Sequence, residues 1–231
     1  MSRKPAIRVA PSAVAAASDL PSATALSVSD PADVDANPTP ISVVRDYASQ
    51  GPFTNGADGS FGVIGCSYKG RTNMMLDVVY RQLVQFGLPM REQWQPTSAR
   101  WDVLLPPHAP DACQDPQTLA RFIDLHRMSA QQDLAVLITL RFSQESLLHR
   151  CWELARGFAL QRLATERATP VVAAFHVPQI AGRRSKPHCH LVMSARRIIG
   201  SHSADFVTDL LGPDGKTLAG DMWRDWCVEH G

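Results

Sequence analysis

Apolar residues occur along this chain in two patterns: short continuous runs, and longer stretches in which they recur every three or four positions. The continuous runs are typical of strands that are covered on both faces. The spaced stretches are typical of helices that bury one side. The runs predict strands at 61–68, 102–105, 134–142, 171–175 and 191–194, and the spaced stretches predict helices at 72–86, 115–128, 144–166 and from about 221 onward.

Strands and helices alternate up to residue 166, and the last two strands then follow each other. The segment 178–187 between these strands holds Gly182, two prolines and three cations, which is typical of a loop. We therefore expect a hairpin here. The order of the elements predicts an α+β fold, in which helices pack against a central, mainly antiparallel sheet. Thr72 is expected to cap the first helix.

Composition divides the chain into two parts. Residues 1–55 are rich in Ala, Ser, Pro and Asp and contain few aromatic residues. Such a segment cannot bury enough apolar surface to offset the entropy that is lost on folding, so we expect a disordered N-terminal tail. Residues 56–231 contain all five tryptophans, enough for the core of one globular domain.

Charge and cysteine usage narrow the class of protein. The formal net charge is only +1, which excludes a strongly basic protein that coats duplex DNA, so any nucleic-acid surface must be a local patch. The five cysteines are scattered and form no C-x-x-C pair, which favours a reducing cytoplasm over a disulfide framework. No stretch approaches the roughly 20 apolar residues of a membrane span. We expect a cytoplasmic protein.

Three histidines in the predicted hairpin are the clearest candidates for chemistry. His188 and His190 are two positions apart on a strand, so their side chains leave the same face of the sheet, and His176 ends the preceding strand beside them. Three neutral imidazoles that converge from a sheet suit a divalent cation such as Mn²⁺, Co²⁺, Ni²⁺ or Zn²⁺. A lone histidine on a strand is more often a packed or solvated residue. Cys189 points to the other face and is interpreted as a core residue.

The loop before His188 is basic. It contains Arg183, Arg184 and Lys186, all within a few residues of the candidate metal ligands. Arg196 and Arg197 follow the second strand of the hairpin. These cations predict that an anionic substrate binds next to the metal; the alternative is an ordinary solvated loop.

The segment PHCHLVMSARRI, with a histidine a dozen positions upstream on an apolar strand, resembles the three-histidine signature of the MobA/MobL relaxases. These are plasmid mobilisation proteins of the HUH endonuclease superfamily. The likeness extends from about Ser60 to the C-terminus and includes weaker segments at 102–110, 134–141 and 223–226 in the family's order. The resemblance implies an antiparallel sheet with the metal on its face and a tyrosine helix opposite. The chain ends at Gly231, before the family's closing helix would finish, so a minimal or truncated relaxase domain is expected.

The resemblance also implies a nucleophile. Relaxases of this family carry a catalytic tyrosine on an early helix, after a turn that resembles GRTNMMLDVVYR in this chain. Here Tyr80 falls one residue later than the usual spacing and is followed by Arg81. From the residues alone, a tyrosine on an amphipathic helix is more often a packing residue, and Tyr68 is a second candidate. Residues expected to contact DNA are Arg71, Arg81, Arg183, Arg184 and Lys186.

The function implied is nicking of single-stranded DNA at a plasmid transfer origin through a phosphotyrosyl intermediate. A divalent metal, Mg²⁺ or Mn²⁺ in the first place and Zn²⁺, Co²⁺ or Ni²⁺ as alternatives, is expected as cofactor, and accessory mobilisation proteins are expected partners. Two alternatives stay open. One is a protein of the same fold that binds origin DNA without cleaving it. The other is a metal-dependent phosphodiesterase that uses water as nucleophile.

One departure from the family concerns acidic residues. The strand equivalent to 134–141 usually carries a pattern like EVE, and its carboxylates can orient a metal-binding histidine. In this chain the aligned positions are Ala135 and Leu137. Asp133 has the parity to lie on the same face and is expected to substitute for them.

Overall fold

A computed structural model describes residues 50–84 and 96–231 of the chain, which belong to one compact unit. The disordered tail predicted for residues 1–55 lies outside the described residues as far as residue 49. The tail boundary itself is wrong, because Gly51 and Pro52 pair with the next strand and Phe53 is only 5% exposed within the core. A two-residue strand made of Gly and Pro has no apolar pattern by which the sequence could have revealed it.

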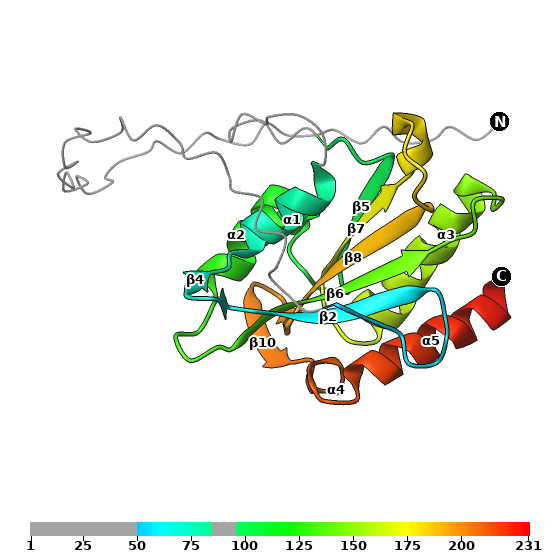
Figure 1. Ribbon diagram of the computed structural model, residues 1–231. Helices are drawn as coiled ribbons and strands as arrows, with labels where there is room; N and C mark the ends of the chain where they lie inside the picture. The colour runs from blue at the N-terminus through cyan, green and yellow to red at the C-terminus, as the bar shows by residue number, and fades with distance from the viewer. Residues whose placement is uncertain (1–49, 85–95) are drawn as a thin grey trace, which may run out of the picture. The chain divides into compact units, whose positions relative to one another are not determined.

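An antiparallel sheet of six strands occupies the middle of this unit, in the order β1-β2-β6-β8-β7-β5 (Figure 1). The most apolar predicted strand, β6, lies inside the sheet between β2 and β8. The strands are β1 (Gly51–Pro52), β2 (Gly59–Gly65), β5 (Arg100–Leu104), β6 (Asp133–Arg141), β7 (Val171–His176) and β8 (His188–Ser194). The predicted α+β fold with an antiparallel sheet is therefore confirmed.

Helices cover both faces of the sheet, as Figure 1 shows. On one face lie α1 (Met75–Leu83) and α2 (Pro116–Leu125). On the other lie α3 (Leu148–Phe158), its π-helical continuation η2 (Ala159–Thr165), α4 (Thr208–Leu211) and α5 (Gly215–His230). Short 3-10 turns occur at η1 (Asp111–Gln114) and η3 (Pro178–Ala181).

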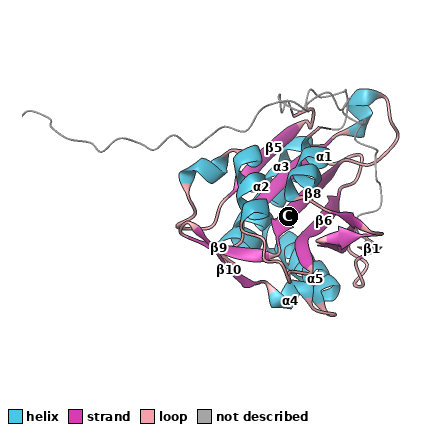
Figure 2. Cartoon of the chain, turned by 90° about the vertical axis from the view of Figure 1, so that its left-hand side faces the viewer, coloured by secondary structure: helices cyan, strands magenta, loops and turns pink. Residues whose placement is uncertain are grey.

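Two small hairpins lie beside the main sheet. One consists of β3 (Ser67–Tyr68) and β4 (Arg71–Thr72), directly before α1. The other consists of β9 (Arg196–Ile199) and β10 (His202–Phe206) and leads into α4 and α5 (Figure 2). This second hairpin was not predicted, because its strands are short and mostly polar.

The sheet separates two apolar cores, and β6 contributes to both. Val136, Ile138 and Leu140 pack against α3 and α5, whereas Ala135 and Leu137 pack against α1 and α2. Because both faces of β6 are covered, its apolar residues form a continuous run and do not alternate with polar ones.

Aromatic side chains fill the core on the α3 side. The Phe158 ring meets Trp223 edge to face at 5.3 Å between centroids. The Trp226 indole donates a 3.0 Å hydrogen bond to the Leu154 carbonyl, and a Cβ at Gly157 would come within 2.9 Å of its ring. Gly157 thus allows α3 and α5 to approach closely.

The start of α1 is capped from another helix. Thr72, the predicted cap, lies in β4, and Met74 at the N-cap position makes no capping bond. Asp124 of α2 accepts hydrogen bonds from the backbone N–H groups of Met75, at 2.8 Å, and Leu76, at 3.1 Å. A carboxylate from a neighbouring helix therefore satisfies the donors that a local cap would otherwise take.

Removing this carboxylate is expected to destabilise the domain. Asp124→Ala should lower the free energy of unfolding by about 1–2 kcal/mol, because two backbone donors lose their acceptor. Asp124→Asn keeps one side-chain oxygen and should lose less. Urea unfolding of both variants checks this, and an equal loss in the two would contradict the capping role.

Candidate metal centre

The pairing of β7 with β8 brings the three predicted histidines together. His176 lies opposite His188, and Ala174 lies opposite His190. Residues that face each other across an antiparallel pair project to the same side of the sheet, so all three rings lie on the face covered by α1 and α2. Ring centroids are 4.9, 5.0 and 5.2 Å apart, and one nitrogen from each ring lies within 4.8 Å of the others.

Each imidazole uses its other nitrogen in a hydrogen bond. His176 Nε2 donates to the Gln82 carbonyl at 2.7 Å, and His188 Nδ1 donates to the Lys186 carbonyl at 2.9 Å. A carbonyl only accepts, so these nitrogens carry the protons and a metal would be bound through Nδ1 of His176 and Nε2 of His188. His190 Nδ1 lies 2.9 Å from the Thr139 hydroxyl, which leaves Nε2 of His190 for the metal.

Burial keeps these rings neutral. Removal from water lowers the pKa of His176 to about 4, and the same cause lowers the pKa values of His188 and His190. The other two histidines and Arg141 depress the pKa of His190 further. Metals bind to neutral imidazoles. At neutral pH, therefore, these rings lose no proton when a cation binds.

Three neutral nitrogen ligands with fixed orientation fit a divalent transition metal. Such a set leaves coordination positions for substrate oxygens, as in catalytic sites. It suits Mn²⁺, Co²⁺, Ni²⁺ or Zn²⁺ better than Mg²⁺, which prefers oxygen ligands. The structure therefore provides a site for a divalent cation without fixing its identity.

Thr139, which no pattern in the sequence marks, orients His190. It lies opposite His190 on β6 and is only 1% exposed. Asp133, the residue expected to replace the family's carboxylates, is six positions away, about 20 Å along the strand. That expectation was therefore wrong: the group that orients His190 is the neutral hydroxyl of Thr139.

No protein-family model matches the chain. No curated protein matches it. A solved structure described as "Molecular Basis of Vancomycin Resistance Transfer in Staphylococcus aureus" is similar, with a TM-score of 0.58 over 74% of this chain and 90% of that chain, at 16% sequence identity. The two chains share this fold. At this identity the likeness shows the fold alone, and membership of the MobA/MobL family stays a prediction.

The triad is covered by the helix that carries Tyr80. Gln82, whose carbonyl binds His176, lies two residues after Tyr80 near the end of α1. The Tyr80 side chain is 9% exposed, its hydroxyl oxygen is buried, and burial raises its pKa. The helix predicted to carry the nucleophile thus lies against the metal centre, and the phenol is enclosed and protonated at neutral pH.

The basic loop lies next to the triad, because Lys186 is two residues before His188. Arg183, Arg184 and Lys186 are all exposed. The Lys186 ammonium pairs with Asp58 at 2.7 Å, and the Arg184 carbonyl accepts a bond from Gln144. Lys186 also contacts the triad through its backbone, because its carbonyl accepts the hydrogen bond that orients His188.

The other predicted DNA contacts are separated. Arg81 lies beside Tyr80 in the last turn of α1, at the triad end. Arg71 lies in β4, beyond Gly65, at the opposite end of β2 from the triad (Figure 1). Arg196 lies at the far end of the β7–β8 hairpin and donates to three backbone carbonyls, those of His126, Ser203 and Ala204. Arg196 is a structural residue, so the patch expected around it does not form.

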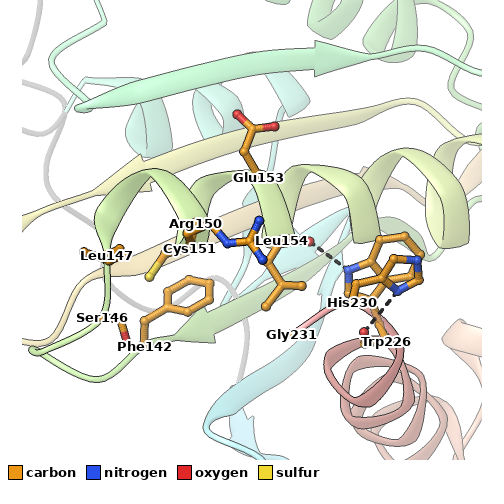
Figure 3. Close-up of a pocket in the computed structure, with 10 residues that line it drawn as sticks. All are labelled: Phe142, Ser146, Leu147, Arg150, Cys151, Glu153, Leu154, Trp226, His230 and Gly231. Atoms are coloured by element: carbon orange, nitrogen blue, oxygen red, sulfur yellow. Dashed lines mark hydrogen bonds between the residues drawn. The ribbon is translucent and has the colours of Figure 1, made fainter.

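A pocket of about 290 Å³ opens on the other side of the sheet, between α3 and the end of α5 (Figure 3). It is lined mainly by apolar side chains such as Phe142 and Leu154, and the stacked rings of Trp226 and His230, 3.7 Å apart, close one side. The metal centre lies on the opposite face and does not contribute to this pocket.

None of the helices in the described ranges combines the length and the apolar character that crossing a membrane requires.

Metal binding is expected to depend on Thr139. Thr139→Val keeps the shape but removes the bond to His190, which should weaken Mn²⁺ or Co²⁺ affinity roughly ten- to a hundredfold. Titration calorimetry checks this. Thr169→Val is the matched control, because Thr169 is equally buried and its hydroxyl donates to the Arg167 carbonyl, away from the triad. Equal affinities in the two variants would rule out the orienting role.

Stability of the metal-free protein should fall in acid. The pKa of His176 is about 4 in the folded state and about 6.5 when unfolded, so between these values the unfolded chain binds more protons. The neutral His176 ring therefore contributes on the order of 3 kcal/mol to the free energy of unfolding above pH 6.5. This contribution is lost as the pH falls towards 4. Urea unfolding in EDTA should show a shallower pH dependence for His176→Gln than for wild type. His202→Gln, an exposed control on β10, should leave the dependence unchanged.

Proposed function

We propose that this protein is a relaxase that nicks single-stranded DNA at a plasmid transfer origin. The observation that supports this best is the convergence of His176, His188 and His190 on the sheet face covered by the Tyr80 helix, within a relaxase-like fold. Cleavage of a phosphodiester with covalent capture of one end requires a nucleophile next to a group that stabilises negative charge. A tyrosine beside a metal held on the sheet meets this requirement.

The protein's own groups would prepare the site. The carbonyls of Gln82 and Lys186 fix the tautomers of His176 and His188, and the Thr139 hydroxyl orients the His190 ring. A divalent cation held there would supply positive charge that stabilises the non-bridging oxygens of the scissile phosphate. Because the ligands lie on paired strands, they need no reorganisation when DNA arrives.

Tyr80 is the proposed nucleophile. Its hydroxyl oxygen would attack phosphorus, so that a bond from oxygen to phosphorus forms while the bond from phosphorus to the 3′ oxygen breaks. The phenolic proton ends on the leaving 3′ oxygen, and the 5′ end of the DNA stays linked to the enzyme. Because the hydroxyl is buried, the end of α1 must move or the side chain must rotate when DNA binds.

Cations near the site would hold the DNA backbone. Arg183, Arg184 and Lys186 lie on the exposed loop before His188, and Arg81 lies at the end of α1. Phosphate contacts of this kind position a strand without reading its sequence. Arg71 would contact DNA well away from the scissile phosphate. We further propose that the protein acts in the cytoplasm with accessory mobilisation proteins.

One observation favours a second candidate. The enclosed Tyr80 hydroxyl is poorly placed for attack in the structure as it stands. A phosphodiesterase that uses the same three histidines but a water nucleophile would need no movement of α1. It would hydrolyse a phosphodiester and form no protein–DNA adduct.

Covalent capture of DNA distinguishes these candidates. Purified protein is incubated with Mn²⁺ and end-labelled oligonucleotides that tile the DNA around its gene, and adducts are resolved on denaturing gels. We expect an adduct on the 5′ phosphate of the fragment downstream of the cut, and this adduct should be absent in EDTA, in Tyr80→Phe and in His190→Ala. Metal content should fall in His190→Ala and stay normal in Tyr80→Phe.

Other outcomes identify the alternatives. Cleavage without adduct, unaffected by Tyr80→Phe, would indicate the water-dependent phosphodiesterase. Binding without cleavage in every metal tested would indicate an origin-binding protein that has lost nicking. Absence of both binding and cleavage would contradict the proposal.

A further inference from the structure

Arg141 lies next to the triad, on the neighbouring strand β6. It ends β6 directly opposite His188, in the cross-strand row that runs from His176 through His188 to Arg141. Paired residues in such a row share one face of the sheet, so the guanidinium belongs to the triad face. Its influence on the pKa values of both His188 and His190 agrees with this position.

The guanidinium is available to an anion. Arg141 is exposed, and among the described residues no carboxylate forms an ion pair with it. Among the described residues its side-chain hydrogen bond goes to the buried hydroxyl of Ser60, 3.4 Å from Nη1, on the neighbouring strand. Nearby Asp58 instead pairs with Lys186. A permanent cation beside a divalent metal is repelled unless an anion lies between them, so the pair favours a phosphate.

On the other side of the triad lies an exposed aromatic ring. Trp101 of the edge strand β5 faces Ala174, which in turn faces His190. Trp101 therefore shares the triad face, two strands and about 10 Å from β8. It is 41% exposed, whereas its neighbour Arg100 lies on the opposite face, 4.0 Å from Glu153 of α3. An exposed indole beside a phosphate site is a stacking platform for a base.

We propose that single-stranded DNA crosses the sheet at its triad end, past the end of α1 and at right angles to the strands, with a base stacked on Trp101 and a phosphate bound by Arg141. This assignment rests on the proposed function and adds the direction of the strand and its two anchoring residues. The bidentate guanidinium supplies the phosphate contact, and the indole supplies a contact that tolerates any base. The span from β5 to β6 is three strand spacings, about 14 Å, or a few nucleotides.

Binding of a labelled single-stranded oligonucleotide of mixed sequence tests the track. Anisotropy titrations are made over a series of salt concentrations, in Mn²⁺ and in EDTA. Arg141→Gln should weaken binding and reduce the slope of log K against log salt by about 0.7, the loss of one phosphate contact. Trp101→Leu should weaken binding roughly tenfold with the slope unchanged, because stacking releases no counterions.

Matched controls lie on the opposite face. Arg100→Gln removes a cation next to Trp101 in sequence, and Arg150→Gln removes an exposed cation of α3; both should bind as wild type does. Arg141→Lys should restore the salt slope. Thermal midpoints and metal content of all variants verify folding.

The outcomes separate the two claims. If wild type binds single-stranded DNA but Arg141→Gln and Trp101→Leu bind equally well with the same slope, the track is wrong and the proposed function can stand. If Arg100→Gln or Arg150→Gln shows the larger loss, the DNA lies on the other face and the track is again wrong. If wild type binds no single-stranded DNA in any condition, the track and the proposed function both fail.

Discussion

Backbone pairing between β7 and β8 decides where the three histidines point. Side chains alternate across a strand, so a slip of one residue would turn a strand's histidines towards the apolar core under α3. The register that sets His176 opposite His188 prevents this. From the other side, β6 fixes the same register and places Thr139 opposite His190. Main-chain hydrogen bonds of three strands thus set the geometry of the metal ligands, and the proposed DNA track follows the same cross-strand rows.

Electrostatics at this site favours a bound anion over a charged protein group. Burial makes protonation of the triad unfavourable, so the rings stay neutral ligands. Arg141 reinforces this, since a nearby cation further disfavours imidazolium. With a metal in place the local charge becomes strongly positive, and the described residues near Arg141 supply no carboxylate to pair with it. A phosphodiester carries the negative charge that both the metal and Arg141 would attract.

The two faces of the sheet differ in composition and in role. The α3 and α5 face is apolar and aromatic, and Gly157 and Trp226 let these helices pack closely. Such packing keeps the strands, and hence the ligands, in place. The α1 face combines an apolar core at one end with the triad at the other. Asp124 fixes the start of α1, and Gln82 near its end contacts His176. The helix that carries Tyr80 is therefore held at both ends, by α2 at its start and by the sheet near its end.

Local patterns in the sequence predicted the fold class and part of the metal site. Alternation and apolar runs predicted the α+β fold and its central strand, and the two-residue spacing of His188 and His190 predicted a shared face. The sequence could not show Thr139, Arg141 or the Asp124 cap, because each acts on a residue at least 47 positions away in sequence, across strands or between helices. Sequence patterns also placed the start of the fold after Gly51–Phe53 and assigned Arg196 to a basic patch. Which groups meet depends on strand order and register, and these arise from pairing between distant segments that no local pattern contains.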